Sequence, residues 1–143
     1  STGSKPMSAG EVFFDSNILV YLTDTESGKA GQTEDLLAEG GVISVQVMNE
    51  FANIALRKVC LGWSETRDFL DTFRATLEIV PLTLETHERG IALAERYQIN
   101  VYDGMIVAAA MMAGCKTLYS EDMHDGLVID GLTIRNPYAA SGR

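Results

Sequence analysis

The chain has 143 residues, a length that suits one domain with its own hydrophobic core. Its apolar fraction of 46% and charged fraction of 22% are ordinary for a globular protein. The net charge of −9 argues against a broad surface for nucleic-acid phosphates, although a local acidic site that holds a cation can still meet one. No apolar stretch reaches the ~18 residues that cross a bilayer, so no membrane partner is expected.

The N-terminal residues and the cysteines bear on processing and location. Residues 1–6, STGSKP, are interpreted as a remnant of expression, and residues 7–143 as a single domain. The N-terminus lacks the long apolar segment of a secretory signal. Cys60 and Cys115 lie far apart and have no CxxC spacing, which favours reduced thiols in a cytoplasmic protein.

Apolar runs of strand length alternate with segments of helical period along the chain. The predicted elements, in chain order, are a strand over 11–14, a short helix over 16–22, a helix over 31–39, a strand over 42–44, a helix from Ser44 to about Lys58, a helix capped by Ser64, a strand ended by Pro81, a helix from Thr83 to about Tyr97, a helix over 102–113, a strand over 115–120, a turn over 121–126 and an edge strand over 132–136. This alternation predicts one α/β domain with a mainly parallel sheet.

Two acidic residues lie within the apolar stripe of their helices. Glu50 comes three residues after Val47 and four before Ile54, so it projects on the side of the helix that faces the core. Asp103 is followed by Ile106 at three residues and by further apolar residues at four and seven. Both carboxylates are therefore expected to point toward the sheet.

Two further acidic residues follow predicted strands. Asp15 comes directly after the strand EVFF, and Asp122 follows the strand CKTLYS by one residue. Ligands of parallel α/β sheets bind beyond the carboxyl ends of the strands, where both of these residues are expected. Glu50 and Asp103 lie near the starts of their helices, so all four carboxylates are predicted to converge at one edge.

Such a cluster is costly unless something offsets the charge. Like charges raise one another's pKa, and partial burial adds to the penalty. A divalent cation removes both problems, and hard oxygen ligands select Mg²⁺ or Mn²⁺. Neither His87 nor His124 has a matching metal spacing, and acids without histidine or thiolate fit phosphodiester hydrolysis better than zinc chemistry.

Each carboxylate also has a purely structural interpretation. Asp15 and Asp103 could be helix N-caps, Asp122 could be a turn residue, and Glu50 could be a salt-bridged or snorkelling side chain. The placement of all four at one edge favours a site.

Three stretches resemble the PIN domain, and in particular the VapC-type toxin ribonucleases of bacterial toxin–antitoxin pairs. They are FFDSNILVYL, ISVQVMNEFANI and VYDGMIVAAAMMAGCKTLYSEDMHDG, and the likeness runs from Val12 to about Asn136. The resemblance implies a PIN-like three-layer α/β/α sandwich with a mainly parallel sheet of about five strands. One departure is Gly104, where members often have alanine, and a glycine there is expected to loosen the helix start by up to ~1 kcal/mol.

Carried over by position, the resemblance implies roles for eight residues. Asp15, Glu50, Asp103 and Asp122 match the acidic catalytic quartet, with Asp15, Asp103 and Asp122 as metal-binding residues. Asp125 matches an additional acid of some members. Ser16, Asn17 and Ser120 match small polar positions that support the acids or a metal water.

The function implied is a Mg²⁺- or Mn²⁺-dependent endoribonuclease that leaves 3′-hydroxyl and 5′-phosphate ends. The implied partners are RNA, a cognate antitoxin whose C-terminal segment covers the acidic groove, and a second copy of the chain in a homodimer. Five basic residues are possible contacts to the RNA backbone or simply solvated charges: Arg57, Lys58, Arg89, Arg96 and Lys116.

Two alternatives come from other classes of protein. One is a non-catalytic RNA-binding or protein-interaction domain on the same fold, which would bind without turnover. The other is a phosphoacceptor receiver domain, which would need paired acids after the first strand, whereas Ser16 and Asn17 follow Asp15.

Overall fold

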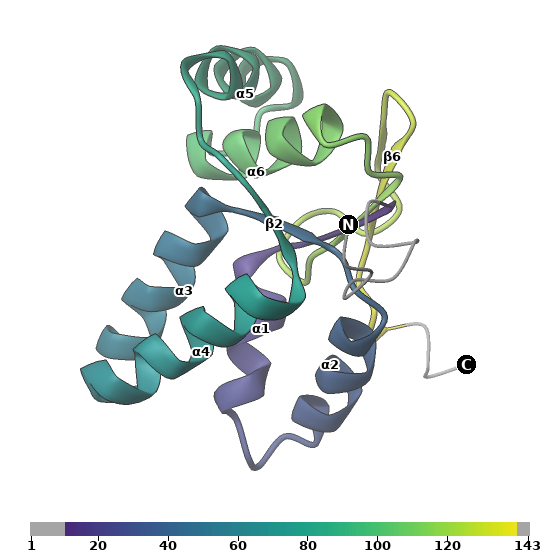
Figure 1. The fold of residues 1–143 in the computed structure, drawn as a ribbon. Coiled ribbons are helices and arrows are strands. Elements are labelled where there is room, and N and C mark those ends of the chain that lie inside the picture. Colours follow the sequence, from purple (N-terminus) through teal and green to yellow (C-terminus); the bar gives the residue numbers. More distant parts are fainter. Residues whose placement is uncertain (1–10, 140–143) are drawn as a thin grey trace.

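The computed structural model describes residues 11–139, which form a six-stranded sheet with helices on both faces (Figure 1). The interpretation of residues 1–6 as an expression remnant lies outside the described residues. The assignment of residues 7–143 to one domain stays a prediction.

The secondary structure alternates as the sequence predicts. The elements are β1 (Val12–Phe14), α1 (Ser16–Val20), the 3₁₀ helix η2 (Tyr21–Thr23), α2 (Lys29–Ala38), β2 (Val42–Ser44), α3 (Val45–Arg57), α4 (Trp63–Thr76), β3 (Glu78–Val80), α5 (Leu84–Tyr97), α6 (Val101–Met112), β4 (Thr117–Tyr119), β5 (Val128–Ile129) and β6 (Leu132–Arg135).

The strand order in the sheet is β3-β2-β1-β4-β6-β5. The first five strands of this order are parallel to one another, and only β5 pairs with β6 in an antiparallel manner. β1 lies between β2 and β4, with Phe13 opposite Val42 on one side and Leu118 on the other. The carboxyl ends of β1, β2 and β4 therefore meet at one edge of the sheet, and the chain leaves β1 there at Asp15.

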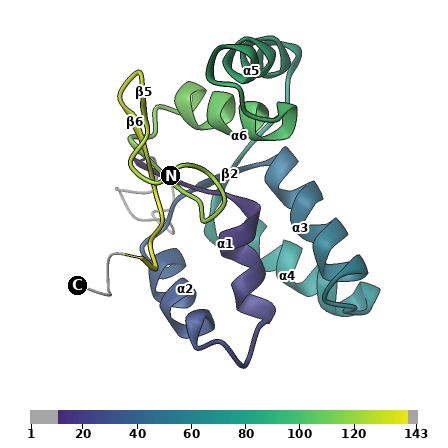
Figure 2. The same ribbon diagram turned by 180° about the vertical axis from the view of Figure 1, so that it is seen from behind.

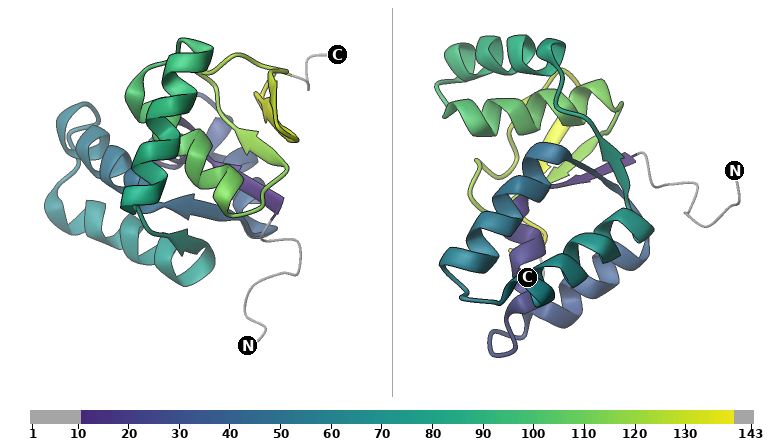
Figure 3. Two further views of the ribbon diagram at one scale, coloured as in Figure 1. Left: turned by 90° about the horizontal axis from the view of Figure 1, so that it is seen from above. Right: turned by 60° about the vertical axis from the view of Figure 1, so that its left-hand side comes forward.

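The sheet is buried on both faces. Phe13 and Phe14 are both fully buried, as are Val42 and Ile43, although successive side chains of a strand point to opposite faces. α5 and α6 lie together on one side of the sheet, and α1, α2 and α4 lie on the other side (Figures 1 and 2). In the right-hand view of Figure 3 the strands run between these two groups of helices. The predicted mainly parallel α/β architecture is confirmed.

Two of the predicted helix caps are confirmed and one is wrong. Ser44 Oγ accepts a hydrogen bond from the Val47 N–H at 3.2 Å, and Thr83 caps α5 in the same way. α4, however, begins at Trp63 with Gly62 as its N-cap, whereas Ser64 was expected to cap it. The Glu65 carboxylate accepts the Gly62 N–H at 3.1 Å, which secures this earlier start.

The last part of the sheet also differs from the prediction. The segment at 132–136 was expected to be an edge strand, but β6 lies inside the sheet between β4 and β5, and β5 is the edge. β5 and β6 form a hairpin whose two-residue loop is Asp130-Gly131, both with positive φ. Asp-Gly is a strong signal for such a hairpin, so the sixth strand could have been found from the sequence.

The contact between α5 and α6 explains the glycine at position 104. A Cβ built on Gly104 would clash with the carbonyl oxygen of Gly90 and would lie 3.2 Å from Ala94 Cβ. A Cβ on Gly90 would in turn lie 3.0 Å from Met105 Cα. The two helices therefore approach each other so closely that glycine is required, and Gly104 tightens this packing where the sequence suggested that it loosens a helix.

The core side of α6 is unusually apolar. Its residues 104–110 are all buried, whereas Met111 is half-buried and Met112 is exposed, so the alanine-rich part of this segment packs inside the protein. Within residues 11–139 no helix is both long and apolar enough to cross a bilayer.

Candidate active site

Asp15 ends β1 and is almost fully buried, with 3% of its surface exposed. Its Oδ1 accepts the Ser16 N–H at 2.7 Å, which makes Asp15 the N-cap of α1. Its Oδ2 accepts hydrogen bonds from Ser120 Oγ at 2.7 Å and from Asn17 Nδ2 at 3.2 Å. Asp15 is thus a helix cap whose second oxygen is held by groups from the end of β4 and from α1.

Burial dominates the electrostatics of Asp15. It raises the pKa of this carboxyl to about 6, against hydrogen bonds from Ser120 and Ser16 that lower it. The negative charges of Asp103 and Glu50 raise it further. The hydrogen bonds that reduce the cost of this buried charge thus come from neutral donors, Ser120 and the Ser16 N–H.

Glu50 reaches Asp15 through a serine hydroxyl. Ser16 Oγ donates to Glu50 Oε1 at 2.9 Å and lies 3.4 Å from Asp15 Oδ1. Gln46, one helical turn earlier on α3, donates from Nε2 to Glu50 Oε2 at 2.9 Å. The expected direction of Glu50 is confirmed, and the salt-bridged alternative is wrong because these partners are neutral.

Asp103 lies on the first turn of α6 as its third residue. Asn100 is the N-cap: its Oδ1 accepts the Asp103 N–H at 2.8 Å, and its Nδ2 donates to Asp103 Oδ2 at 3.1 Å. The alternative in which Asp103 is the cap is therefore wrong. Partial burial raises the pKa of Asp103 first, and the charges of Glu50 and Asp122 raise it further.

Asp122 lies in a bend after β4 and is exposed. The negative charge of Asp122 raises the pKa of Asp103, and the negative charge of Asp103 raises the pKa of Asp15. Four carboxylates from separate parts of the chain are therefore linked pairwise by their charges: Glu50 and Asp103 act on Asp15, and Glu50 and Asp122 act on Asp103. We call these four residues the acidic cluster.

The supporting residues fall into two groups. Ser16, Asn17 and Ser120 contact the acidic cluster directly, as described above. Asp125 has a different partner: its Oδ1 accepts the Asn136 N–H at 2.9 Å, which ties the turn after β4 to the segment after β6. Within residues 11–139 no hydrogen bond or ion pair joins Asp125 to the acidic cluster.

The donor set of the acidic cluster suits a hard cation. All its donors are carboxylate oxygens, with serine hydroxyls and an asparagine amide beside them, and no histidine or thiolate takes part. Within residues 11–139 no three Asp, Glu, His or Cys side chains are arranged to hold a metal ion between them. Mg²⁺ keeps several waters and needs only one or two direct carboxylates, so this open arrangement fits Mg²⁺ or Mn²⁺ better than a fully protein-ligated ion.

Several residues around the cluster were not predicted. Asn100 could have been found from its capping-box spacing to Asp103, and Gln46 from its i,i+4 spacing to Glu50. Lys29 and Tyr21 contact Glu121, the neighbour of Asp122, across 92 and 100 positions of the chain. No local pattern reveals such a contact.

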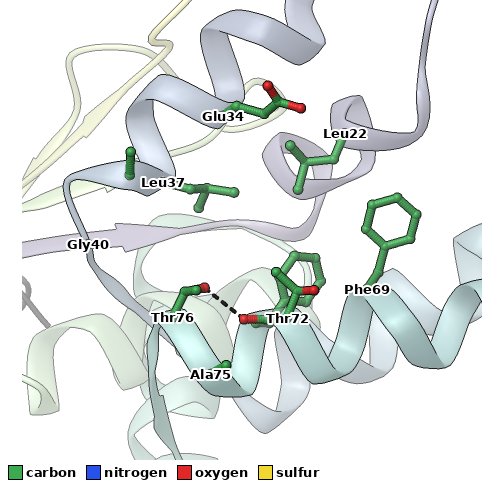
Figure 4. A pocket seen from close by; sticks show the side chains of 10 residues that line it. Leu22, Glu34, Leu37, Gly40, Phe69, Thr72, Ala75 and Thr76 are labelled. Carbon is green, nitrogen blue, oxygen red and sulfur yellow. Dashed lines mark hydrogen bonds between the residues drawn. The ribbon is translucent and has the colours of Figure 1, made fainter. Parts of the chain in front are cut away.

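A cavity of about 420 Å³ lies away from the cluster, between α2, η2 and α4. Figure 4 shows Leu22 and Leu37 facing Phe69 and Thr72 across it, with Glu34 at one side. None of the four carboxylates of the acidic cluster lines this cavity.

The fold and the acidic cluster define an α/β domain that gathers carboxylates beyond the carboxyl ends of parallel strands. Residues 12–124 match the PIN domain family, and the chain belongs to this family. No curated protein matches the chain at a significant level.

Solved structures with the same fold include toxins of toxin–antitoxin systems. VapC20 of Mycobacterium tuberculosis, described as a sarcin-ricin loop cleaving toxin, has a TM-score of 0.67 at 16% identity over 78% of this chain and 90% of that chain. A toxin–antitoxin complex from Klebsiella pneumoniae has a TM-score of 0.67 at 22% identity over 90% and 98%. DNA-bound VapBC from Salmonella typhimurium has a TM-score of 0.65 at 17% identity over 87% and 96%. At these identities the likeness shows a shared fold.

Proposed function

We propose that this protein is a Mg²⁺- or Mn²⁺-dependent endoribonuclease and the toxin of a toxin–antitoxin pair. The main support is the acidic cluster, in which carboxylates from distant segments of the chain raise one another's pKa at the carboxyl edge of the sheet. Membership of the PIN family and the likeness to VapC toxins support nuclease activity on RNA.

Asp15 and Asp103 would hold the cation directly, and Asp122 and Glu50 would complete its coordination or orient its waters. When bound, Mg²⁺ or Mn²⁺ neutralises these carboxylates, lowers the pKa of a water and stabilises negative charge on phosphate oxygens. Ser16 and Gln46 hold the Glu50 carboxylate by hydrogen bonds, which supports the role proposed for it in orienting a water. Ser120 and Asn17 keep Asp15 Oδ2 in one position, which preserves the geometry of the site.

The reaction proposed is hydrolysis of an RNA phosphodiester. The oxygen of a water forms a bond to phosphorus as the water gives up a proton to solvent, the bond from phosphorus to O3′ breaks, and O3′ takes up a proton from solvent. The products carry a 3′-hydroxyl and a 5′-phosphate. The protein contributes orientation and charge, which are the main contributions to phosphoryl transfer.

The test compares Asp15→Asn with Asp68→Asn in cleavage of an RNA oligonucleotide with added Mg²⁺ or Mn²⁺. Asp68 is exposed on α4, so its substitution changes the net charge equally without touching the cluster. We expect Asp15→Asn to lose at least ~100-fold in rate, and Asp68→Asn and the wild type to cleave alike. Retained cleavage in Asp15→Asn, with contaminating nuclease excluded, would refute the role of Asp15. RNA binding without turnover at any metal concentration would favour the non-catalytic alternative.

The proposed partners are an antitoxin and a second copy of this chain, in the cytoplasm. An acidic edge suits an antitoxin segment that carries arginine, because bidentate pairing of guanidinium with carboxylate is strong. Copurification with the product of a small adjacent reading frame tests the antitoxin, and sedimentation of the isolated chain tests the homodimer.

A further inference from the structure

A hydrogen-bonded network joins Glu121, the neighbour of Asp122, to Tyr21 of η2 and Lys29 of α2. Lys29 Nζ donates to Glu121 Oε2 at 2.9 Å, and Tyr21 OH donates to Glu121 Oε1 at 2.5 Å. Lys29 also donates to Tyr21 OH at 3.2 Å, so these three side chains close a triangle. Within residues 11–139 the other two ion pairs each lie in a single helix, at i,i+3 and i,i+4, whereas this one spans 92 positions.

Two aromatic rings hold the lysine in place. Lys29 Nζ lies 4.6 Å from the centroid of the Tyr21 ring and 5.0 Å from that of the Tyr138 ring. Thr33 Oγ1 donates to the Lys29 carbonyl at 2.8 Å, so the Tyr138 hydroxyl is the donor in its 2.6 Å contact with Thr33. The hydrogen bond of the ammonium group to Glu121, and to a lesser extent the one to Tyr21, raises the pKa of Lys29 to about 12. Lys29 is therefore a cation at neutral pH.

Asp122 depends on its neighbours for its position. Within residues 11–139 its carboxylate makes no hydrogen bond or ion pair, and it is exposed. The residues on either side are fixed. The Glu121 N–H donates to Asn17 Oδ1 at 3.1 Å, and the Met123 N–H donates to Ser120 Oγ at 3.3 Å.

We infer that Lys29 and Glu121 are positioning residues that hold the Ser120–Met123 segment, and with it Asp122, beside the other carboxylates of the acidic cluster. The backbone of Glu121 is fixed by Asn17 and its side chain by Lys29 and Tyr21, so both ends of this residue are tied to α1 and α2. Asp122 follows it directly and carries no anchor of its own. The inference rests on the proposed function only where it treats Asp122 as part of the site.

The first measurement is amide hydrogen exchange, which needs neither metal nor RNA. We expect Lys29→Gln to increase the exchange rates of the Glu121 and Met123 amides by roughly tenfold, because a charge-assisted anchor is lost. Lys29→Arg keeps the cation and should restore most of the protection. Arg74→Gln is the matched control, since it removes the exposed ion pair with Asp71 on α4 and should leave both amides unchanged.

The second measurement is Mn²⁺ binding by titration calorimetry. We expect Lys29→Gln and Glu121→Gln to weaken Mn²⁺ binding by about tenfold, while Lys29→Arg and Arg74→Gln bind like the wild type. Glu121→Gln keeps the shape of the side chain, so it tests the network if Lys29→Gln folds poorly.

Unchanged exchange and unchanged Mn²⁺ affinity in both glutamine variants would overturn the inference. A wild type that binds Mn²⁺ but does not cleave RNA would instead overturn the proposed function. The exchange rates and Mn²⁺ affinities of the variants would still test the positioning role of Lys29 and Glu121. The two failures are therefore distinguishable.

Discussion

The carboxylate of Asp15 is held by hydroxyl, amide and backbone donors that reduce the cost of its burial without removing it. Its pKa of about 6 in the folded protein is raised from 3.8 in the unfolded chain. The folded state therefore binds this proton more tightly than the unfolded state does. The stability that Asp15 contributes is full below about pH 4 and is lost as the pH rises through about 6.

This direction of the pH dependence leads to a prediction for the stability of the metal-free protein. Asp15→Asn cannot titrate, so the stability of the wild type relative to this variant should fall as the pH rises from about 4 to about 7, by up to roughly 3 kcal/mol. Urea unfolding in a chelator, at several pH values in that range, measures the difference. A difference that stays constant with pH would show that burial does not raise the pKa of Asp15.

Ser120 gives a second prediction at this scale. It is fully buried, donates to Asp15 Oδ2 and accepts the Met123 N–H. Ser120→Ala therefore removes the acceptor of the Met123 N–H and leaves Asp15 Oδ2 with the Asn17 hydrogen bond alone. We expect a loss of about 1–3 kcal/mol in the free energy of unfolding at neutral pH. Denaturant unfolding measures it, with the exposed Ser64→Ala as the control. Equal stability of the two variants would contradict the assigned contacts.

A site residue could be predicted where its role shows in the spacing of nearby residues, and could not where it depends on a contact with a distant part of the chain. Glu50 and Asp103 interrupt apolar stripes, and Asp15 and Asp122 follow strands, so their approach to one edge is predicted from spacing. In the structure Glu50 and Asp103 raise the pKa of Asp15, and Asp122 raises the pKa of Asp103. Their catalytic roles stay predictions. The contact of Lys29 with Glu121 could not be read, because it depends on how α2 packs beside the loop after β4.

Among the elements, the contact of α5 with α6 is the one where helix propensity and packing disagree. Alanine at position 104 would favour the helix by about 1 kcal/mol over glycine. The Gly90 carbonyl lies where its Cβ would be, however, and a backbone group inside a packed helix pair cannot move cheaply.

We therefore expect Gly104→Ala to destabilise the protein by roughly 1–3 kcal/mol in spite of its higher propensity. Gly31→Ala is the matched control, because it also lies in a helix and has nothing within 4 Å of a built Cβ. It should stabilise by up to ~1 kcal/mol. Thermal unfolding of both variants measures the difference, and a stabilised Gly104→Ala would show that the helices separate easily.

The helices that were predicted well begin with a residue that is a strong N-cap. Ser44 and Thr83 accept the backbone N–H three residues on, as their positions indicate. Ser64 failed as a cap because Glu65 already secures the N–H of Gly62. β5 was missed because two residues are too short to show a period, although the Asp130-Gly131 turn marks its hairpin.

At the scale of the whole molecule, the acidic cluster makes folding and cation binding interdependent. Its members come from the end of β1, from α3, from α6 and from the loop after β4. The unfolded chain separates these segments, so a cation that binds the cluster binds the folded state preferentially. The repulsion that raises the pKa of Asp103 is relieved by the same cation.

Mn²⁺ should accordingly raise the midpoint of thermal unfolding. At a free concentration about a hundredfold above the dissociation constant, the expected gain is about 2.7 kcal/mol, and chelation should reverse it. The gain should shrink as the pH falls below about 6, because the proton that Asp15 then holds competes with the cation. Asp15→Asn should lose most of the gain and Asp68→Asn none of it, with ionic strength matched by NaCl. An equal gain in both variants would place the cation elsewhere on this acidic surface, since a cluster that needs Asp15 cannot bind it unchanged without that carboxylate.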